Sequence, residues 1–154
     1  EDLANDIVAN YYDIYKEHLV DKTQPFEGII QLLSDLDNAG IIVATMSNKD
    51  EFNVRKIVQK FFPGLIRYPF GHSPQYPAKP DPTHCLALLQ EIGVKREETI
   101  YIGDSHIDMQ TGKNGKFHTI GVDWGYENTD ILRETGADYI VYKAEEIWEL
   151  AQKL

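Results

Sequence analysis

The segment Thr99-Ile100-Tyr101-Ile102-Gly103-Asp104-Ser105-His106-Ile107-Asp108 indicates a strand that passes directly into a helix. Its first four residues favour β-structure, and Gly103 ends that run. Ser105 with Asp108 three positions later forms a helix-capping pattern. Ligands of open α/β sheets bind where the carboxyl end of a strand meets a helix N-terminus. Asp104 and Asp108 are therefore candidate ligands for a hard cation such as Mg²⁺.

Each carboxylate also has a purely structural explanation. Asp104 could cap a turn, and Asp108 could do no more than complement the helix dipole, as first-turn acids often do. For Asp104, at a strand end after glycine, the functional interpretation is the stronger one. For Asp108 the two interpretations are balanced.

The rest of the chain alternates between strand-like and helix-like segments. The run Ile41-Ile42-Val43-Ala44-Thr45-Met46 is short, continuous and β-branched, which is typical of a strand buried on both faces. Expected helices cover approximately residues 3–19, 27–39, 50–61, 82–92, 105–114, 129–134 and 144–152, and expected strands cover 41–46, 65–70, 99–103, 119–122 and 138–141. This order predicts an α/β fold with a doubly wound, mostly parallel sheet.

Composition limits the functional classes. The 154 residues suit one domain, and 25 acidic against 15 basic residues give a net charge of −10. This charge disfavours nucleic acid and anionic membranes as partners. No apolar run approaches the roughly 20 residues that cross a bilayer. Cys85 is the only cysteine, so no internal disulfide forms; we expect a cytoplasmic protein and a buried, unreactive thiol.

Polar residues follow three of the expected elements, and there the chain resembles a known family. The matching pieces are Thr45-Met46-Ser47-Asn48-Lys49, Ala78-Lys79-Pro80-Asp81-Pro82, Gly103-Asp104-Ser105-His106-Ile107-Asp108 and Gly121-Val122-Asp123-Trp124-Gly125-Tyr126. In order and spacing they resemble the haloacid dehalogenase (HAD) superfamily of phosphohydrolases, in its phosphoglycolate-phosphatase-like branch with a helical cap. The ordered set is far more specific than any one piece.

The resemblance implies a role for each residue. Ser47 would hydrogen-bond a phosphoryl oxygen, and Lys79 would neutralise charge on the nucleophile and the transferring phosphoryl group. Asp104 would bind Mg²⁺, with Asp108 as a second ligand or as support, and Asn48 and Lys49 would reach substrate. Taken alone, Ser47 could simply cap a helix and Lys79 could be a solvated lysine. The implied activity is Mg²⁺-dependent hydrolysis of a small phosphate monoester through an aspartyl-phosphate, with 2-phosphoglycolate the leading substrate.

One part of the family pattern is missing, namely the strand ending in Asp-x-Asp that carries the nucleophile. Asp35-Leu36-Asp37 has the spacing but lies within an amphipathic helix, where Leu36 packs inward and the acids face solvent. We therefore expect an N-terminally truncated phosphatase: residues 1–24 a remnant of the cap and its linker, and 25–154 a core without its first strand. By itself this chain is expected to be inactive.

The missing strand would leave two strand edges without hydrogen-bond partners, so we expect gap closure, recruitment of a segment, or dimer-like strand pairing. The expected partner is otherwise a small phosphorylated metabolite. A phospho-acceptor receiver domain is a rival interpretation, disfavoured because the strand at 41–46 is followed by Ser47-Asn48-Lys49 rather than by an acidic pair. A non-catalytic module that binds phosphate or Mg²⁺ remains a second alternative.

Overall fold

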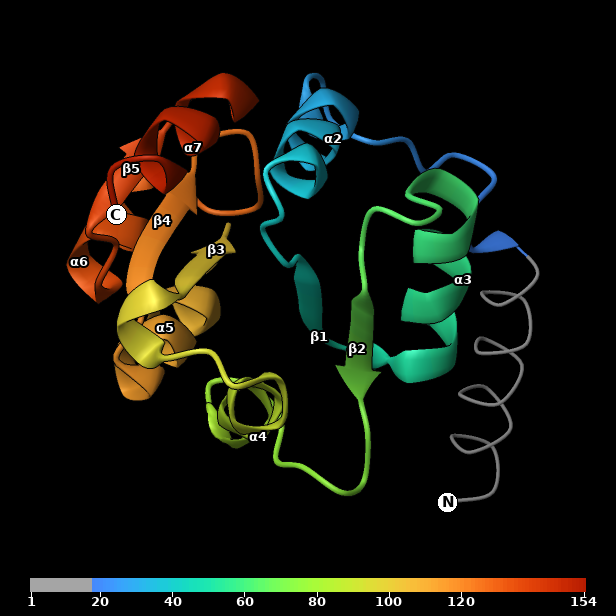
Figure 1. The fold of residues 1–154 in the computed structure, drawn as a ribbon, viewed down its shortest axis with the longest axis horizontal. Coiled ribbons are helices and arrows are strands. Elements are labelled where there is room, and N and C mark those ends of the chain that lie inside the picture. Colours follow the sequence, from blue (N-terminus) through green and yellow to red (C-terminus); the bar gives the residue numbers. More distant parts are fainter. Residues whose placement is uncertain (1–17) are drawn as a thin grey trace, which may run out of the picture.

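The computed structural model describes residues 18–154, with helices packed around two short parallel sheets (Figure 1). The predicted helix at 3–19, and with it most of the expected cap remnant, lies outside the described residues. Among the described residues no helix has the length and apolarity to cross a membrane. The α/β class predicted from the alternating pattern is confirmed.

The strands divide into a pair and a triplet. The pair consists of β1 (Ala44–Asp50) and β2 (Tyr68–His72), and the triplet of β3 (Ile100–Gly103), β4 (His118–Val122) and β5 (Tyr139–Val141) in the order β3-β4-β5. Every pairing is parallel. Among residues 18–154 no ladder joins β1 to β3, so each of these two strands has a described partner on one edge only.

Helices surround both sheets, as Figure 1 shows. Their bounds are α2 (Ile29–Asn38), α3 (Glu51–Phe61), α4 (Thr83–Ile92), α5 (His106–Gly115), α6 (Thr129–Thr135) and α7 (Ala144–Ala151), with a 3₁₀ turn η1 (Arg96–Glu98). The α3 helix packs on β1 and β2, and α5 packs on β3 and β4. The predicted helices from α2 onward and all five strands are present, with ends shifted by at most four residues.

The main core joins α2 to the triplet. Leu32 and Leu36 of α2 pack in one cluster with Ile120 and Val122 of β4 and with residues of β5 and α7. Ile120 is fully buried, and burying a side chain of this size contributes about 1.5–3 kcal/mol. The α2 helix precedes β1 in sequence but packs against the triplet β3-β4-β5. This packing links the two sheets.

The run at 41–46 differs from its prediction. Its first three residues are not part of a strand, and Ile41 and Ile42 are each 37% exposed rather than buried on both faces. The reason is that β1 has no neighbour on its second edge in the part of the chain that the structure describes. At its other end the pairing with β2 becomes irregular between Met46 and Asp50, so the chain that carries Ser47 to Lys49 departs from a regular ladder.

Two smaller expectations have different outcomes. Cys85 lies on α4 and is buried, and this burial raises the pKa of its thiol to about 11, consistent with an unreactive core residue. Because glycine commonly ends helices in the left-handed conformation, the sequence predicts Gly115 as the stop of α5. Gly115 instead lies inside that helix, and Lys116 adopts the left-handed conformation. A Cβ at Gly115 would come within 2.2 Å of the Phe117 ring, so close packing explains the glycine.

Candidate active site

A nearly buried ion pair lies where the two sheets approach each other. The Nζ atom of Lys79, on the loop between β2 and α4, donates to Asp108 Oδ1 of α5 at 2.6 Å. The two side chains are only 15% and 9% exposed. A charge-assisted bond in such surroundings is strong and fixes both groups. The predicted meeting of Lys79 with the segment after β3 is therefore present.

The second carboxylate oxygen of Asp108 is also engaged. Oδ2 accepts a hydrogen bond from Ser105 Oγ at 2.7 Å and one from the Asp104 N–H at 3.3 Å. Ser105 in turn caps α5, because its Oγ accepts the Asp108 N–H. Gly103 leaves room for this arrangement, since a Cβ there would lie 2.2 Å from Asp108 Cβ. Asp108 thus binds Lys79 and its own helix terminus with both oxygens, which fits support better than open ligation.

Asp104 has a different environment. Its Oδ2 accepts the Tyr126 N–H at 3.0 Å, and its carbonyl oxygen accepts the Glu127 N–H at 3.0 Å. A Cβ on Gly125 would lie 2.0 Å from Asp104 Cβ, so the loop after β4 passes directly against this carboxylate. Within residues 18–154, Oδ2 is the only oxygen of the Asp104 carboxylate with a hydrogen bond. Its Oδ1 atom is available to a ligand.

Glu127 was not among the residues predicted from the sequence. Its carboxylate accepts the His106 N–H at 2.5 Å through Oε2, and its Oε1 lies 2.7 Å from His106 Nδ1. The hydrogen bond with the His106 side chain, aided by the main-chain bond and the attraction of the ring, holds the pKa of Glu127 below its ordinary value. The two residues are 21 positions apart, so no local pattern signals the pair.

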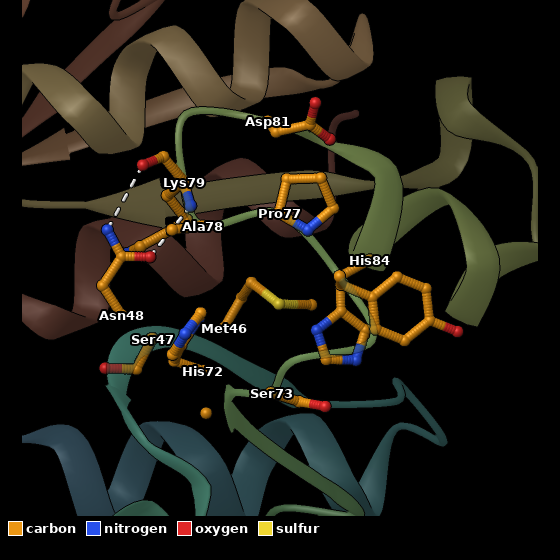
Figure 2. A pocket seen from close by; sticks show the side chains of 12 residues that line it. Met46, Ser47, Asn48, His72, Ser73, Pro77, Ala78, Lys79, Asp81 and His84 are labelled. Atoms are coloured by element: carbon orange, nitrogen blue, oxygen red, sulfur yellow. Dashed lines mark hydrogen bonds between the residues drawn. The ribbon is translucent and has the colours of Figure 1, made fainter.

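Asn48 contacts the lysine segment, and its predicted contact with substrate stays a prediction. Its Nδ2 donates to the Lys79 carbonyl at 3.2 Å, and its Oδ1 accepts the Lys79 N–H at 2.8 Å (Figure 2). From the other side, Asn114 Nδ2 of α5 donates to the Pro80 carbonyl at 3.0 Å. Two asparagines therefore fix the main chain that carries the catalytic candidate Lys79.

Ser47 and Lys79 line the same small cavity, with a volume of about 10 Å³, enough for about one water molecule. On its far side His84 is sandwiched between aromatic rings, with centroids 4.1 Å from Tyr76 and 4.6 Å from Phe70. Figure 2 shows Ser47, Asn48 and Lys79 grouped on one side and His84 on the other. The Ser47 hydroxyl also accepts the Lys49 N–H at 3.1 Å.

Lys49 lies on β1 with its side chain half-buried. Its predicted contact with substrate stays a prediction. Hydrogen bonds thus join Lys79 to Asp108 and Asp108 to Asp104. Ser47 and Asn48 line the small cavity together with Lys79, whereas Asp104 and Asp108 do not line it.

The carboxylates fit part of a magnesium site. No cluster of three histidine, cysteine or acidic side chains suited to a metal occurs in the described part of the chain. Mg²⁺ nevertheless needs only one or two protein carboxylates when phosphate oxygens and water complete its shell. The open Oδ1 of Asp104 meets that requirement in part, and Asp108 lies beside it already committed to Lys79.

Comparison with known proteins agrees with this geometry. The family model for haloacid dehalogenase-like hydrolases matches residues 1–122. A phosphoglycolate phosphatase of Agrobacterium fabrum is 32% identical over 77% of this chain and 51% of its own length. An N-acetylmuramic acid 6-phosphate phosphatase of Pseudomonas aeruginosa is 27% identical over 93% of this chain and 64% of its own length.

The fold is shared with solved structures as well. The crystal structure of a proposed phosphoglycolate phosphatase from Lactobacillus delbrueckii subsp. bulgaricus superposes with a TM-score of 0.90 at 33% identity. That match covers 98% of this chain and 63% of the other. The chain spans between about half and two thirds of the length of the curated relatives it matches. The chain belongs to the haloacid dehalogenase-like hydrolase family.

Proposed function

We propose that this chain is the core of a Mg²⁺-dependent phosphatase that hydrolyses small phosphate monoesters. The observation that carries the proposal is the Lys79 ammonium, which is fixed at 2.6 Å from Asp108 and lines one cavity with Ser47. Phosphoryl transfer depends mainly on charge that is positioned before the reaction begins. A buried lysine beside a hydroxyl donor and a strand-end carboxylate supplies such charge.

Each residue has a distinct task in the proposed reaction. Lys79 offsets negative charge on the phosphoryl oxygens, and the Ser47 hydroxyl donates a hydrogen bond to one of them. Asp104 would hold Mg²⁺ through its open oxygen, and the ion when bound would neutralise further phosphoryl charge. Asp108 keeps the lysine in place, because both of its oxygens are engaged. Asn48 fixes the lysine main chain.

The nucleophile is the part of the proposal that these residues do not supply. In the described part of the chain, the acids hydrogen-bonded into the site are Asp104, Asp108 and Glu127. Asp108 is engaged by Lys79, and Glu127 by His106. The family resemblance implies an Asp-x-Asp strand between β1 and β3, each of which has one unpaired edge within residues 18–154. We therefore propose that turnover needs such a strand and that these 154 residues alone do not hydrolyse phosphate esters.

The substrate class is proposed from the site and the relatives together. Two of the relatives compared above are named for phosphoglycolate and N-acetylmuramic acid 6-phosphate, which share a phosphate monoester and differ in the organic part. Ser47, Lys79 and Asp104 would all address the shared phosphate. A small phosphate monoester, with 2-phosphoglycolate first, is therefore the class to test.

The proposal can be tested with orthophosphate as the probe. Calorimetric titration of the 154-residue chain with phosphate, in the presence of MgCl2, is expected to show one site. Lys79→Met should weaken phosphate binding at least about tenfold, since a charge-assisted bond contributes about 1.5–3 kcal/mol. Lys95→Met removes an exposed lysine near η1 and is the matched control. Equal affinity in wild type and Lys79→Met, or no binding to wild type, would contradict the proposal.

An activity assay tests the phosphatase activity and the need for an additional strand separately. With p-nitrophenyl phosphate and MgCl2, the purified chain should release no phosphate above background. Measurable turnover that Lys79→Met abolishes would support the phosphatase but refute the need for an added strand.

A non-catalytic module that binds phosphate or Mg²⁺ is the second candidate. It is favoured by one observation, the engagement of Asp108 by Lys79, which leaves Asp104 as the carboxylate with an open oxygen. This candidate predicts phosphate binding without turnover even for the natural full-length product. Mg²⁺-dependent hydrolysis by that product would exclude it.

A further inference from the structure

We propose that Glu127 is a positioning residue, which clamps the loop after β4 onto the start of α5 and thereby sets the direction of the Asp104 carboxylate. The inference rests on the proposed function, because it concerns the carboxylate assigned there to Mg²⁺. Residues 123 to 128 form the loop in question and connect β4 to α6.

Glu127 forms the clamp through hydrogen bonds to the two residues that flank the N-cap of α5. The Glu127 carboxylate accepts the His106 N–H at 2.5 Å and lies 2.7 Å from the His106 ring. The Glu127 N–H donates to the Asp104 carbonyl at 3.0 Å. Glu127 therefore contacts residues on either side of Ser105, the cap of α5, through its main chain and its side chain.

These bonds fix the position of the neighbouring main-chain amide in the loop, that of Tyr126. The Tyr126 N–H donates to Asp104 Oδ2 at 3.0 Å, and Gly125 lies so close that a Cβ would come within 2.0 Å of Asp104 Cβ. With Oδ2 held by the Tyr126 N–H, rotation of the Asp104 side chain is restricted, and Oδ1 has no hydrogen bond within residues 18–154. The Tyr126 ring is 85% exposed and provides no packing of its own.

The Glu127 side chain is placed to act as a fixed acceptor. It is only 13% exposed, in contrast to the 46% of its partner His106. Its carboxylate also lies at the first turn of α5, where the helix dipole favours negative charge. A group that orients a metal ligand through hydrogen bonds typically changes metal affinity by about 10–100-fold when removed.

The experiment uses the 154-residue chain and two NMR readouts. In Glu127→Ala, the Tyr126 amide should exchange with solvent at least about tenfold faster, since its loop loses two anchoring bonds. Titration with MgCl2, followed at the Asp104 to Ile107 amides, should show an affinity about tenfold weaker than wild type. Glu127→Gln keeps an oxygen acceptor for the His106 N–H, so both values should return most of the way to wild type.

Glu146→Ala is the matched control. Its carboxylate also accepts a main-chain N–H at a helix start, that of Tyr142 at 2.8 Å before α7. It follows β5, two strands away from β3, and should leave the exchange of Tyr126 and the Mg²⁺ response unchanged. Unaltered exchange in β4 and β5 confirms in each variant that the sheet is folded.

The outcomes separate the inference from the function on which it rests. Unchanged Tyr126 exchange in Glu127→Ala would overturn the clamp, and faster exchange with unchanged Mg²⁺ affinity would overturn its role in positioning. A wild-type chain whose Asp104 to Ile107 amides do not respond to MgCl2 would overturn the proposed metal site and the inference with it. That last result is visible without any variant.

Discussion

The strands β4 and β1 both pair in parallel with their neighbours, yet they have opposite environments. β4 pairs with β3 and β5, and four of its five residues are buried. Within the described residues β1 pairs only with β2, and none of its seven residues is buried. Apolar sequence alone therefore does not make a central strand. The number of hydrogen-bonded neighbours determines how much surface a strand can bury.

The candidate site lies at the boundary between these two regions. Ser47 and Lys79 come from the β1–β2 side, whereas Asp104 and Asp108 follow β3. The Lys79–Asp108 pair joins the two sides and is the least exposed ion pair among residues 18–154. Substitutions can therefore be made within either region or at the contact between them. The size of each effect on stability and function tests the comparison of β4 with β1.

The largest expected difference is between isoleucines of the two regions. Ile120→Ala in β4 should lower the free energy of unfolding by about 4 kcal/mol, because a fully buried side chain leaves a cavity. Ile42→Ala, at a position 37% exposed before β1, should lower it by about 1 kcal/mol. Urea denaturation followed by circular dichroism measures both. Equal losses would show that residues 41–43 are buried in solution, for instance by pairing between two chains.

The next largest effect concerns the contact between the regions. Lys79→Met leaves the Asp108 carboxylate nearly buried without its cation, which should cost about 3 kcal/mol of unfolding free energy. Arg67→Met breaks the exposed pair of Arg67 and Asp37, whose side chains are 51% and 39% exposed, and should cost less than about 1 kcal/mol. Adding Asp108→Asn to Lys79→Met should recover part of the loss. A Lys79→Met chain as stable as Arg67→Met would mean that the pair is solvated.

A smaller effect is expected where the loop after β4 meets Asp104. Gly125→Ala places a Cβ 2.0 Å from Asp104 Cβ, and relief of that clash should cost about 2 kcal/mol. Gly40→Ala has open space but a positive φ of 76°, so it should cost about 1 kcal/mol. The NMR signals of Asp104 and Ser105 should move in Gly125→Ala and stay in place in Gly40→Ala. Unmoved Asp104 signals in Gly125→Ala would contradict the close approach.

The sequence predicted local features well and long-range partners poorly. The Ser105 cap and the strand ending at Gly103 follow from neighbouring residues, so both were predictable. The exposure of Ile41 and Ile42 was not predictable, because their run has the composition of a buried strand. The run is exposed because β1 has no second neighbouring strand within the described residues.

The site shows the same limit. Lys79 and Asp104 were identified through ordered family motifs, which encode distant contacts indirectly. The engagement of Asp108 by Lys79, of Asn48 by the lysine main chain, and of Glu127 by His106 joins residues 21 to 31 positions apart. No periodicity or capping pattern reaches that far, so these roles became visible only with the fold.

The smallest expected effect is the pH-dependent stabilisation that one carboxylate gives to the triplet of strands. Asp138, just before β5, accepts hydrogen bonds from the Thr119 main chain and hydroxyl, each at 2.8 Å, and from Lys113. Burial alone would raise the pKa of Asp138, but these bonds outweigh it and hold the pKa below its ordinary value. The stabilisation is therefore present above the unfolded pKa of about 3.9 and is lost as pH falls through the lower folded value.

Asp138→Asn should accordingly cost less than about 1 kcal/mol near neutral pH, and the cost should disappear as pH falls through the lowered pKa of Asp138, because the wild-type carboxylate is then protonated too. Amide exchange should locate the loss in β4 and β5 and leave β1 and β2 unaffected, because Asp138 bonds to Thr119 of β4. Asp130→Asn changes an exposed acid on α6 and is the control. A loss of protection that spreads equally to β1 and β2 would show that the pair and the triplet unfold as one cooperative unit.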